Sequence, residues 1–252
     1  MSKIDKQIAL KQPAAQKIDI QNIDKKVPLN DIEFFLNFCG SDIQSAVQEL
    51  EKIKTEANRK HLQKLVYVNL VNRFDYLVDK LLLWLATNND PLRNEILESV
   101  EEETISRKEV FEIFFMKNNA YDLIIEKIKD LARGSLLRER HSDKLFKILS
   151  KCLEWKSIEK PRVSNDGKIF AKATKNKTQP NDIVGYADWL YSRRNSLVHG
   201  DGKKYNQKDR EHMVLRYQVN LPDNFRLQLA SIKSATTFYE SLLKEIGKSL
   251  FG

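Results

Sequence analysis

The feature that most constrains this sequence is a run of apolar residues at helical spacing between residues 43 and 84. In its first half, one helical face would carry Ile43, Val47, Leu50, Ile53 and Ala57. Beyond a polar stretch at 58–61, the face continues with Leu65, Val68, Val71, Leu77, Leu81 and Trp84. Apolar residues three and four apart share one side of a helix, so the run predicts one long helix or two helices with a break. Because its second half is apolar on most sides, we expect that half to be the central helix of a bundle.

Shorter helices are predicted on both sides of this run from caps, turn residues and apolar spacing. They cover 32–38, ended by Gly40; 41 onward, capped by Ser41 and Asp42; a helix after Asn88–Pro91; 110–116, after a capping box at 106–109; 121–133, ended by Gly134; 145–155, capped by Ser142; 182–200; 207–219; and 225–250. Only 8 Gly and 6 Pro occur in 252 residues, which disfavours an all-β fold with many tight turns. The sequence therefore predicts an all-α helical bundle, formed by a single domain over residues 29–252.

Two segments fall outside the helical pattern. Residues 1–28 are polar and rich in lysine, and we interpret them as a flexible or loosely docked N-terminal extension. Residues 156–181 contain seven Lys or Arg against two acidic residues, which is +5 of the chain's net charge of +8. Within them Asn165-Asp166-Gly167 lies between Val163 and Ile169, a turn signal that predicts a small hairpin. A long segment without helices inside a compact domain is often functional.

Composition excludes several classes of protein. The longest apolar stretch, at 81–86, is far too short for a membrane span, and the first residues lack the pattern of a secretory signal. Cys39 and Cys152 lack metal-ligand spacing, so we interpret them as reduced core residues. His61, His141 and His212 stand in charged surroundings and are predicted to be surface residues. We expect a cytoplasmic protein without a membrane anchor, a metal site or a cofactor.

The candidate for chemistry is the segment Arg194-Asn195-Ser196-Leu197-Val198-His199-Gly200, at the end of the helix predicted from Asp182. Asn195 and His199 are four residues apart and project from one helical face. Arg194 lies roughly 140° around the axis from His199, but its long side chain can still reach the same groove. The segment also fits a purely structural role, because cations in a last turn and a glycine after it form a good helix end.

These residues resemble a known family signature. Arg-Asn-x-x-x-His-Gly at the end of a late helix, in a basic all-helical chain, is similar to the motif of the HEPN superfamily, in which an Arg is followed after four to six residues by a His. The resemblance is to bacterial HEPN proteins of the RiboL-PSP type, from toxin–antitoxin and phage-defence loci. The motif covers seven residues, and the helical context extends the likeness loosely over residues 60–250. One departure is Asp201, which stands where toxins silenced by nucleotide transfer carry a Tyr.

The resemblance implies a metal-independent endoribonuclease of a toxin–antitoxin or anti-phage defence system. In such enzymes the ribose 2′-hydroxyl attacks the adjacent phosphate and leaves a 2′,3′-cyclic phosphate and a 5′-hydroxyl. His199 would transfer a proton near neutral pH, and Arg194 would bind the phosphate and stabilise its developing charge. Asn195 would orient His199 or the phosphate.

The resemblance also implies partners. HEPN chains pair so that two Arg–His sets line one cleft, and we therefore expect a homodimer that binds RNA. The basic residues expected to contact the RNA backbone are Arg193, Lys168, Lys172, Lys175 and Lys177, although a solvated loop explains the lysines equally well. An antitoxin or a defence-complex subunit is a further expected partner. Two alternatives stay open: a non-catalytic HEPN-like module that binds RNA or a protein, and a helical scaffold subunit of a defence complex.

Overall fold

The structure is a computed structural model. It describes residues 26–99, 120–156, 162–172, 178–200 and 204–251, together with the single residues 108, 158, 160 and 202. The predicted all-α fold is confirmed. The helices are α1 (Lys26–Phe38), α2 (Gln44–Lys52), α3 (Glu56–Asn88), α4 (Asp90–Ser99), α6 (Ala120–Ser135), α7 (His141–Lys147), α8 (Ile183–His199), α9 (Gln207–Tyr217) and α10 (Leu229–Phe251). Shorter π-helical or 3₁₀ turns cover Cys39–Ile43, Leu136–Arg138 and Ile148–Cys152.

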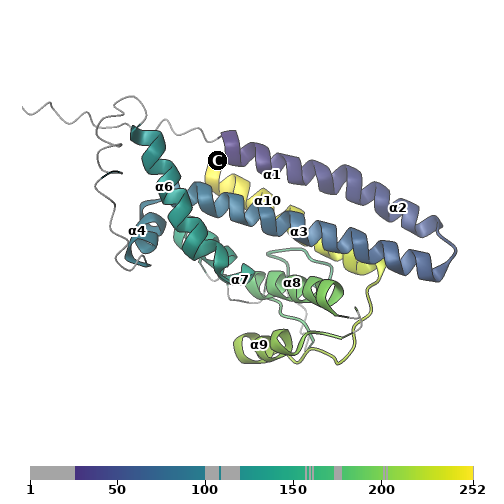
Figure 1. Ribbon diagram of the computed structural model, residues 1–252. Coiled ribbons are helices and arrows are strands. Elements are labelled where there is room, and N and C mark those ends of the chain that lie inside the picture. Colours follow the sequence, from purple (N-terminus) through teal and green to yellow (C-terminus); the bar gives the residue numbers. More distant parts are fainter. Residues whose placement is uncertain are drawn as a thin grey trace, which may run out of the picture.

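Helix α3 is the central element of the bundle, as the sequence predicts. It has 33 residues, and it packs against α1, α2, α4, α6, α7, α8 and α10. Figure 1 shows α1 and α2 along one side of α3, α4 and α6 at one end, and α8 below it with α9 outermost. The fully buried side chains of α3 include Tyr67, Leu70 and Phe74, and Phe74 stacks on Tyr239 of α10 at 4.0 Å between ring centroids. Between residues 77 and 88 every residue of α3 is buried or half-buried, which explains why this part of the sequence is apolar on most sides.

The junction between α1 and α2 corrects one expectation. Gly40 does not end a helix, because α1 passes into α2 through the π-helical turn Cys39–Ile43. Ser41 therefore does not act as an N-cap; its hydroxyl donates to the backbone oxygen of Asn37 at 2.8 Å. The chain instead breaks at residues 53–55, and the polar stretch 58–61 lies inside α3.

Other boundaries agree with the sequence or differ by a few residues. The helix expected after Asn88–Pro91 is present as α4; it starts at Asp90, and the side-chain oxygen of Asn89 caps it by accepting from the backbone N–H of Leu92 at 3.0 Å. Ser142 lies inside α7 instead of capping it, because that helix already starts at His141. Phe225 precedes α10. The predicted helix at 110–116, its capping box apart from residue 108, and residues 1–25 of the N-terminal extension lie outside the described residues.

The predicted hairpin is present as a small turn. Val163 and Ile169 form an isolated antiparallel bridge, and the backbone N–H of Gly167 donates to the Ser164 oxygen at 3.0 Å. Gly167 has a φ of +86°, and a Cβ there would collide with the backbone of Ser234 on α10. Glycine is therefore required both by the turn and by its close packing on α10.

None of the described helices combines the length and the apolar character needed to cross a lipid bilayer.

Candidate functional site

The Arg194–Gly200 segment forms the last turns of α8. The helix starts as predicted, with the Asp182 carboxylate accepting from the backbone N–H of Gly185 at 2.7 Å. Its first two turns are buried, so they fix α8 against α3 and α7. The last two turns reach the surface, and His199 is exposed. The fold therefore presents the motif at the end of a firmly anchored helix.

Arg194 is partly buried and held in a defined orientation. Its Nε donates to Oδ1 of Asn72 on α3 at 2.5 Å, and its Nη1 donates to Oδ1 of Asn195 at 3.0 Å. The guanidinium also lies 5.5 Å from the ring centroid of Tyr191. Both hydrogen-bond acceptors are neutral amides, and among the residues that the structure describes Arg194 forms no salt bridge. Its guanidinium is therefore oriented by neutral groups, while its charge also acts on the Asp75 carboxylate from beyond salt-bridge distance.

An ionic group beneath Arg194 corrects the expected position of His141. This histidine is only 2% exposed; its Nδ1 lies 2.6 Å from Oδ1 of Asp75, and its ring stacks on Tyr191. Burial by itself would raise the pKa of Asp75. The hydrogen bond with His141 and the charges of His141, Lys144 and Arg194 outweigh burial, so the pKa of Asp75 is lowered. The buried imidazole thus supports the ring on which Arg194 lies.

Asn195 connects the motif to a second buried ionic network. Its amide donates to Oδ2 of Asp209 on α9 at 3.4 Å. Arg140, which precedes α7, donates to Asp209 and to Asp188, each at 2.9 Å. Charge-assisted hydrogen bonds next to Asn195 therefore join α8 to α9 and to the residue that precedes α7.

Asp188 is the centre of this network and is completely buried. Besides Arg140, it contacts Nε2 of His212 at 2.8 Å and accepts from the Tyr217 hydroxyl at 3.1 Å. Burial would raise the pKa of Asp188, but the hydrogen bond with His212 and the Arg140 charge outweigh it and leave the pKa lowered. His212 is therefore a bound network member, which corrects its expected place among simple surface residues.

His199 has a different environment from Arg194. It is the last residue of α8, it is exposed, and its side chain makes no hydrogen bond with Arg194 or with another residue in the described part of the chain. The structure thus presents one oriented cation and one solvent-exposed imidazole on the same helix end.

Arg193 was expected to contact RNA, and its position contradicts that expectation. The side chain is 5% exposed, and its guanidinium lies among the rings of Tyr67, Trp189 and Phe225 at 4.8–5.6 Å. Its Nη2 donates to the Ser231 hydroxyl at 3.2 Å. Arg193 therefore packs α8 against α3 and the start of α10, and it presents no charge at the surface.

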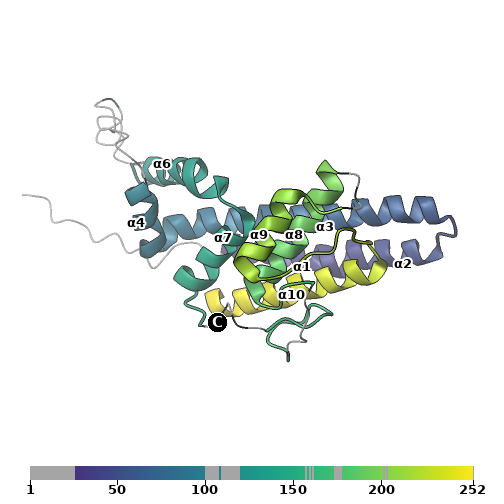
Figure 2. The same cartoon turned by 90° about the horizontal axis from the view of Figure 1, so that it is seen from below.

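The basic loop lies away from the motif. Lys168 and Lys172 are exposed, and Lys168 pairs with Asp166 at 3.2 Å. The hairpin is joined to the start of α8, because the backbone N–H of Val163 donates to the oxygen of Asn181 at 2.8 Å. The 17 residues of α8 extend for about 25 Å, so the motif is a helix length away. Figure 2 shows the loop and the end of α8 on opposite edges of the molecule. Lys175 and Lys177 lie outside the described residues.

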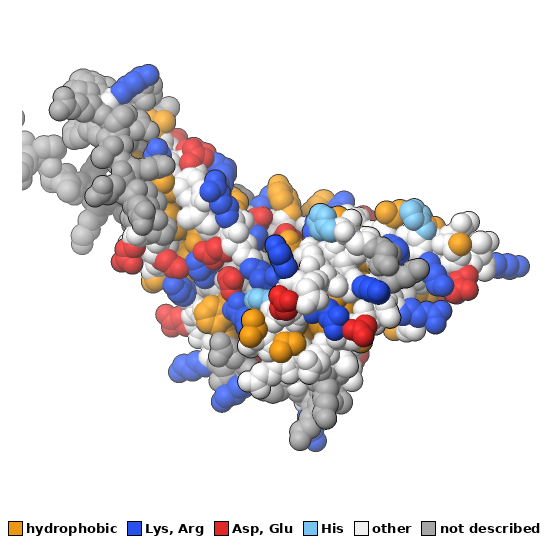
Figure 3. Space-filling model, turned by 60° about the horizontal axis from the view of Figure 1, so that its bottom comes forward, with side chains coloured by type: hydrophobic (Ala, Val, Ile, Leu, Met, Phe, Trp, Pro, Cys, Tyr) orange, Lys and Arg blue, Asp and Glu red, His pale blue; other side chains and the backbone are white. Residues whose placement is uncertain are grey.

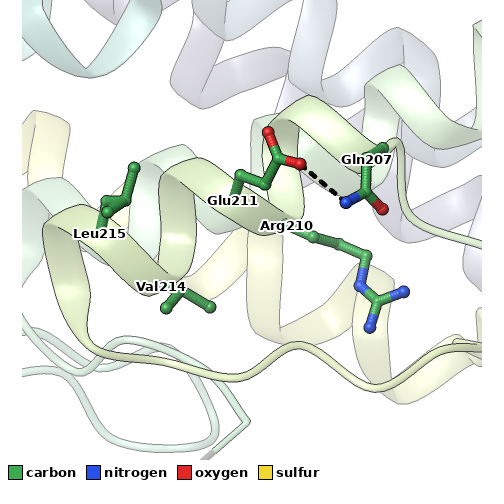
Figure 4. Close-up of a pocket in the computed structure, with 5 residues that line it drawn as sticks. All are labelled: Gln207, Arg210, Glu211, Val214 and Leu215. Atoms are coloured by element: carbon green, nitrogen blue, oxygen red, sulfur yellow. Dashed lines mark hydrogen bonds between the residues drawn. The ribbon is translucent and has the colours of Figure 1, made fainter.

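Two pockets lie near the end of α8. A shallow one of about 470 Å³ runs along α9, where Gln207 donates to Glu211 at 2.7 Å and where Val214 and Leu215 are exposed (Figure 4). A second pocket of about 360 Å³ lies between the start of α3 and the segment before α10. It is lined by Ala57, Lys60, His61, Lys64, Gly202, Phe225, Arg226 and Leu227. In Figure 3, basic and hydrophobic side chains lie interspersed with a few acidic ones on the face that turns toward the viewer.

Several residues of this site carry no clear sequence signal. Asn72 and Tyr191 stand in ordinary helical sequence, and Arg140 stands among other charges. Asp188 is the exception, because it interrupts the apolar run 183–190 and an acid at such a position needs a buried partner.

The part of the chain with described coordinates contains no cluster of three or more His, Cys, Asp or Glu side chains arranged to hold a metal ion. No protein-family model, no curated protein and no solved structure matches this chain.

Proposed function

We propose that this protein is a HEPN-like, metal-independent endoribonuclease of a bacterial toxin–antitoxin or anti-phage defence system, acting in the cytoplasm. The observation that carries the proposal is the state of Arg194, whose guanidinium is held by two amide oxygens and forms no salt bridge with a described carboxylate. Other arginines of the described chain, such as Arg140 and Arg216, bind carboxylates instead. An oriented arginine without a salt-bridge partner suits a phosphate, which it binds through parallel N–H donors.

The proposed reaction needs a phosphate-binding cation and a group that transfers protons. The 2′-hydroxyl oxygen attacks the adjacent phosphorus, its proton leaves to a base, and the 5′-oxygen of the next nucleotide leaves and takes up a proton. His199 is exposed at the end of α8, and an imidazole can accept or donate a proton near neutral pH. Arg194 stabilises the negative charge that develops on the phosphate oxygens. DNA lacks the attacking hydroxyl and is not cut.

Asn195 has a positioning role in this proposal. Its side-chain oxygen accepts from Arg194 and its amide donates to Asp209, so it couples the phosphate-binding cation to the buried network. This arrangement supports orientation of Arg194 by Asn195.

The cleavage test uses purified protein and RNA in the presence of EDTA. We expect fragments that end in a 2′,3′-cyclic phosphate, with single-stranded DNA left intact. His199→Ala and Arg194→Ala should each lower the cleavage rate by at least ~10²-fold, because each removes a group used in the transition state. Arg133→Ala, which removes an exposed arginine on α6 paired with Asp130, is the control and should keep full activity.

Three results would contradict the nuclease: no cleavage by the intact protein, full cleavage by both motif variants, or cleavage that requires a divalent metal. Retention of RNA without cleavage would instead support the non-catalytic binding module, and indifference to RNA would support the scaffold.

The proposal includes a homodimer in which two α8 ends face one shared cleft. An exposed apolar side chain beside the motif is consistent with it: Val198 on the last turn of α8 is 45% exposed, and a shared cleft would cover it. Light scattering should give the mass of two chains for the intact protein and of one chain for Val198→Lys. A single-chain mass for the intact protein would rule out the shared cleft.

A further inference from the structure

The basic pocket between α3 and the segment before α10 is not used by the proposed chemistry. Four of its lining residues are basic or titratable: Lys60, His61, Lys64 and Arg226. It also contains apolar surface from Phe225 and Leu227, both half-buried. Pockets of about this volume accept small organic ligands, and a positive rim around an apolar floor suits a ligand with both an anionic and a flat apolar part.

The pocket is continuous with the motif end of α8. Gly202 lines it and is three residues after His199, so their Cα atoms lie within about 11 Å of each other. Gly202 has a φ of +71°. The end of the Lys64 side chain lies so close to Gly202 that a Cβ on this residue would displace the lysine side chain. A strand of nucleic acid with its phosphate at the motif would therefore reach the pocket within about three stacked nucleotides, at about 3.4 Å each.

Two basic side chains at the rim of the pocket share one carboxylate. Lys60 lies at 2.5 Å from Glu56 and Arg226 at 3.5 Å. Both ion pairs are at least half exposed, and such pairs contribute only about 0–1 kcal/mol, so an incoming phosphate can replace Glu56 at small cost.

Phe225 supplies the apolar wall. On the protein side its ring packs on Tyr205 at 4.7 Å between centroids and lies 5.2 Å from the Arg193 guanidinium. This packing fixes the ring, so an incoming base can stack on it without ordering a flexible side chain.

We propose that this pocket binds one unpaired nucleotide of the substrate strand, on the side of the cleavage point that faces α3 and α10. Lys60 and Arg226 bind its phosphate, and Phe225 stacks on its base. This proposal extends the proposed nuclease function and rests on it, because the position of the strand is defined by placing the cleaved phosphate at the motif. A base held in a double helix cannot reach the ring, so the pocket selects single strands over duplexes.

The test measures binding of a labelled single-stranded DNA oligonucleotide, which the proposed reaction cannot cleave, by fluorescence anisotropy. Glu56→Gln removes the competing carboxylate and should tighten binding roughly fivefold, the effect of about one unit charge at 4 Å in water. Misfolding cannot produce such a gain. Glu51→Gln is the matched control, because Glu51 is similarly exposed, pairs with Lys233 and lies outside the pocket; it should change affinity little.

The double variant Lys60→Gln with Arg226→Gln tests the rim directly. We expect affinity to fall roughly tenfold and the slope of log affinity against log salt to shrink by about 0.7, since the two side chains share one phosphate and each phosphate neutralised on a single strand contributes about 0.7. Lys248→Gln, at an exposed lysine paired with Glu245, should leave both values unchanged. A duplex of the same sequence should bind more weakly than the single strand.

The nucleotide-binding role of the pocket would be overturned if Glu56→Gln and Glu51→Gln changed the affinity equally. Equal affinity for duplex and single strand would overturn it as well. Pocket-dependent binding in a protein that never cleaves RNA would support the pocket and contradict the nuclease. The two proposals can therefore fail separately.

Discussion

Arg193 and Arg194 are neighbours in the chain, but a rotation of about 100° per residue turns them toward different sides of α8. Arg193 enters a cage of aromatic rings, where cation–π contacts and the Ser231 hydroxyl compensate for lost hydration. Arg194 stays partly exposed and is held by amide oxygens. At the scale of single residues, the groups that surround each guanidinium therefore decide whether its charge is buried or reaches the surface.

Asp188 gives a prediction at the same scale. Its carboxylate is fully buried and binds both Arg140 and His212, so Asp188→Asn leaves His212 without its carboxylate partner and leaves Arg140 with Asp209 alone. We expect the free energy of unfolding to fall by about 3 kcal/mol, the lower end of the cost of breaking a buried ion pair. Urea denaturation followed by circular dichroism measures it.

The control for Asp188 is Asp143→Asn. Asp143 pairs with Arg216 at a site where both side chains are more than a third exposed, so its loss should cost no more than about 1 kcal/mol. If both variants lowered the free energy of unfolding equally, the buried network would stabilise the fold no more than a surface ion pair does.

At the scale of elements, the ends of helices depend on what each helix packs against. Gly40 would end a helix only by adopting a left-handed conformation, and here it stays helical because Phe35, Phe38 and Ile43 on the same segment are buried in the core. Gly185, in the first turn of α8, is instead closely surrounded by other side chains. A Cβ there would come within 3 Å of side-chain atoms of Asp182, Pro180 and Tyr217.

These two glycines should respond in opposite directions to the same substitution. A Cβ on Gly40 meets nothing within 4 Å, so Gly40→Ala should raise the free energy of unfolding by about 0.5–1 kcal/mol. Gly185→Ala should lower it by about 1–3 kcal/mol through overpacking. Denaturation curves of the two variants check the signs, and a destabilised Gly40→Ala would mean that the π-helical turn needs glycine.

At the scale of the whole molecule, one long helix organises the packing. Helix α3 contributes Asn72 to the motif, Asp75 to the ionic group beneath it, and Lys60 and Lys64 to the basic pocket. Residues that belong to separate sites are thus fixed on one rigid element, so their spacing along the surface is set by the helical rise.

The lowered pKa values of Asp75 and Asp188 predict how the whole protein responds to acid. A carboxyl whose folded pKa lies below its ordinary value of 3.8 stabilises the fold above that value and loses this contribution as the pH falls through the folded pKa. Asp79 acts in the opposite direction, because burial raises its pKa despite the hydrogen bond from Lys144. The pKa values of Glu56, Glu95 and Asp166 are lowered as well, so the balance of the described carboxyls predicts a net loss of stability on acidification.

The measurement is the free energy of unfolding in urea from about pH 7 to about pH 3, with Asp188→Asn beside the intact protein. The curve of the variant should be flatter below about pH 4. Parallel curves would show that Asp188 titrates identically in the folded and unfolded chain.

The sequence by itself determined the all-α class, the central helix, the cap of α8, the hairpin turn and the placement of the motif at a helix end. These depend on short-range properties, namely helical periodicity, capping and turn preferences, which can be seen within a few residues. Only the tertiary structure decided that Arg193 is buried while Arg194 binds Asn72 from 122 residues away, that His141 and His212 have carboxylate partners, and that the basic loop lies at the far end of α8. The physical reason is that a charge has no fixed position until distant segments pack, because its surroundings determine whether water, a ring or an opposite charge compensates for it.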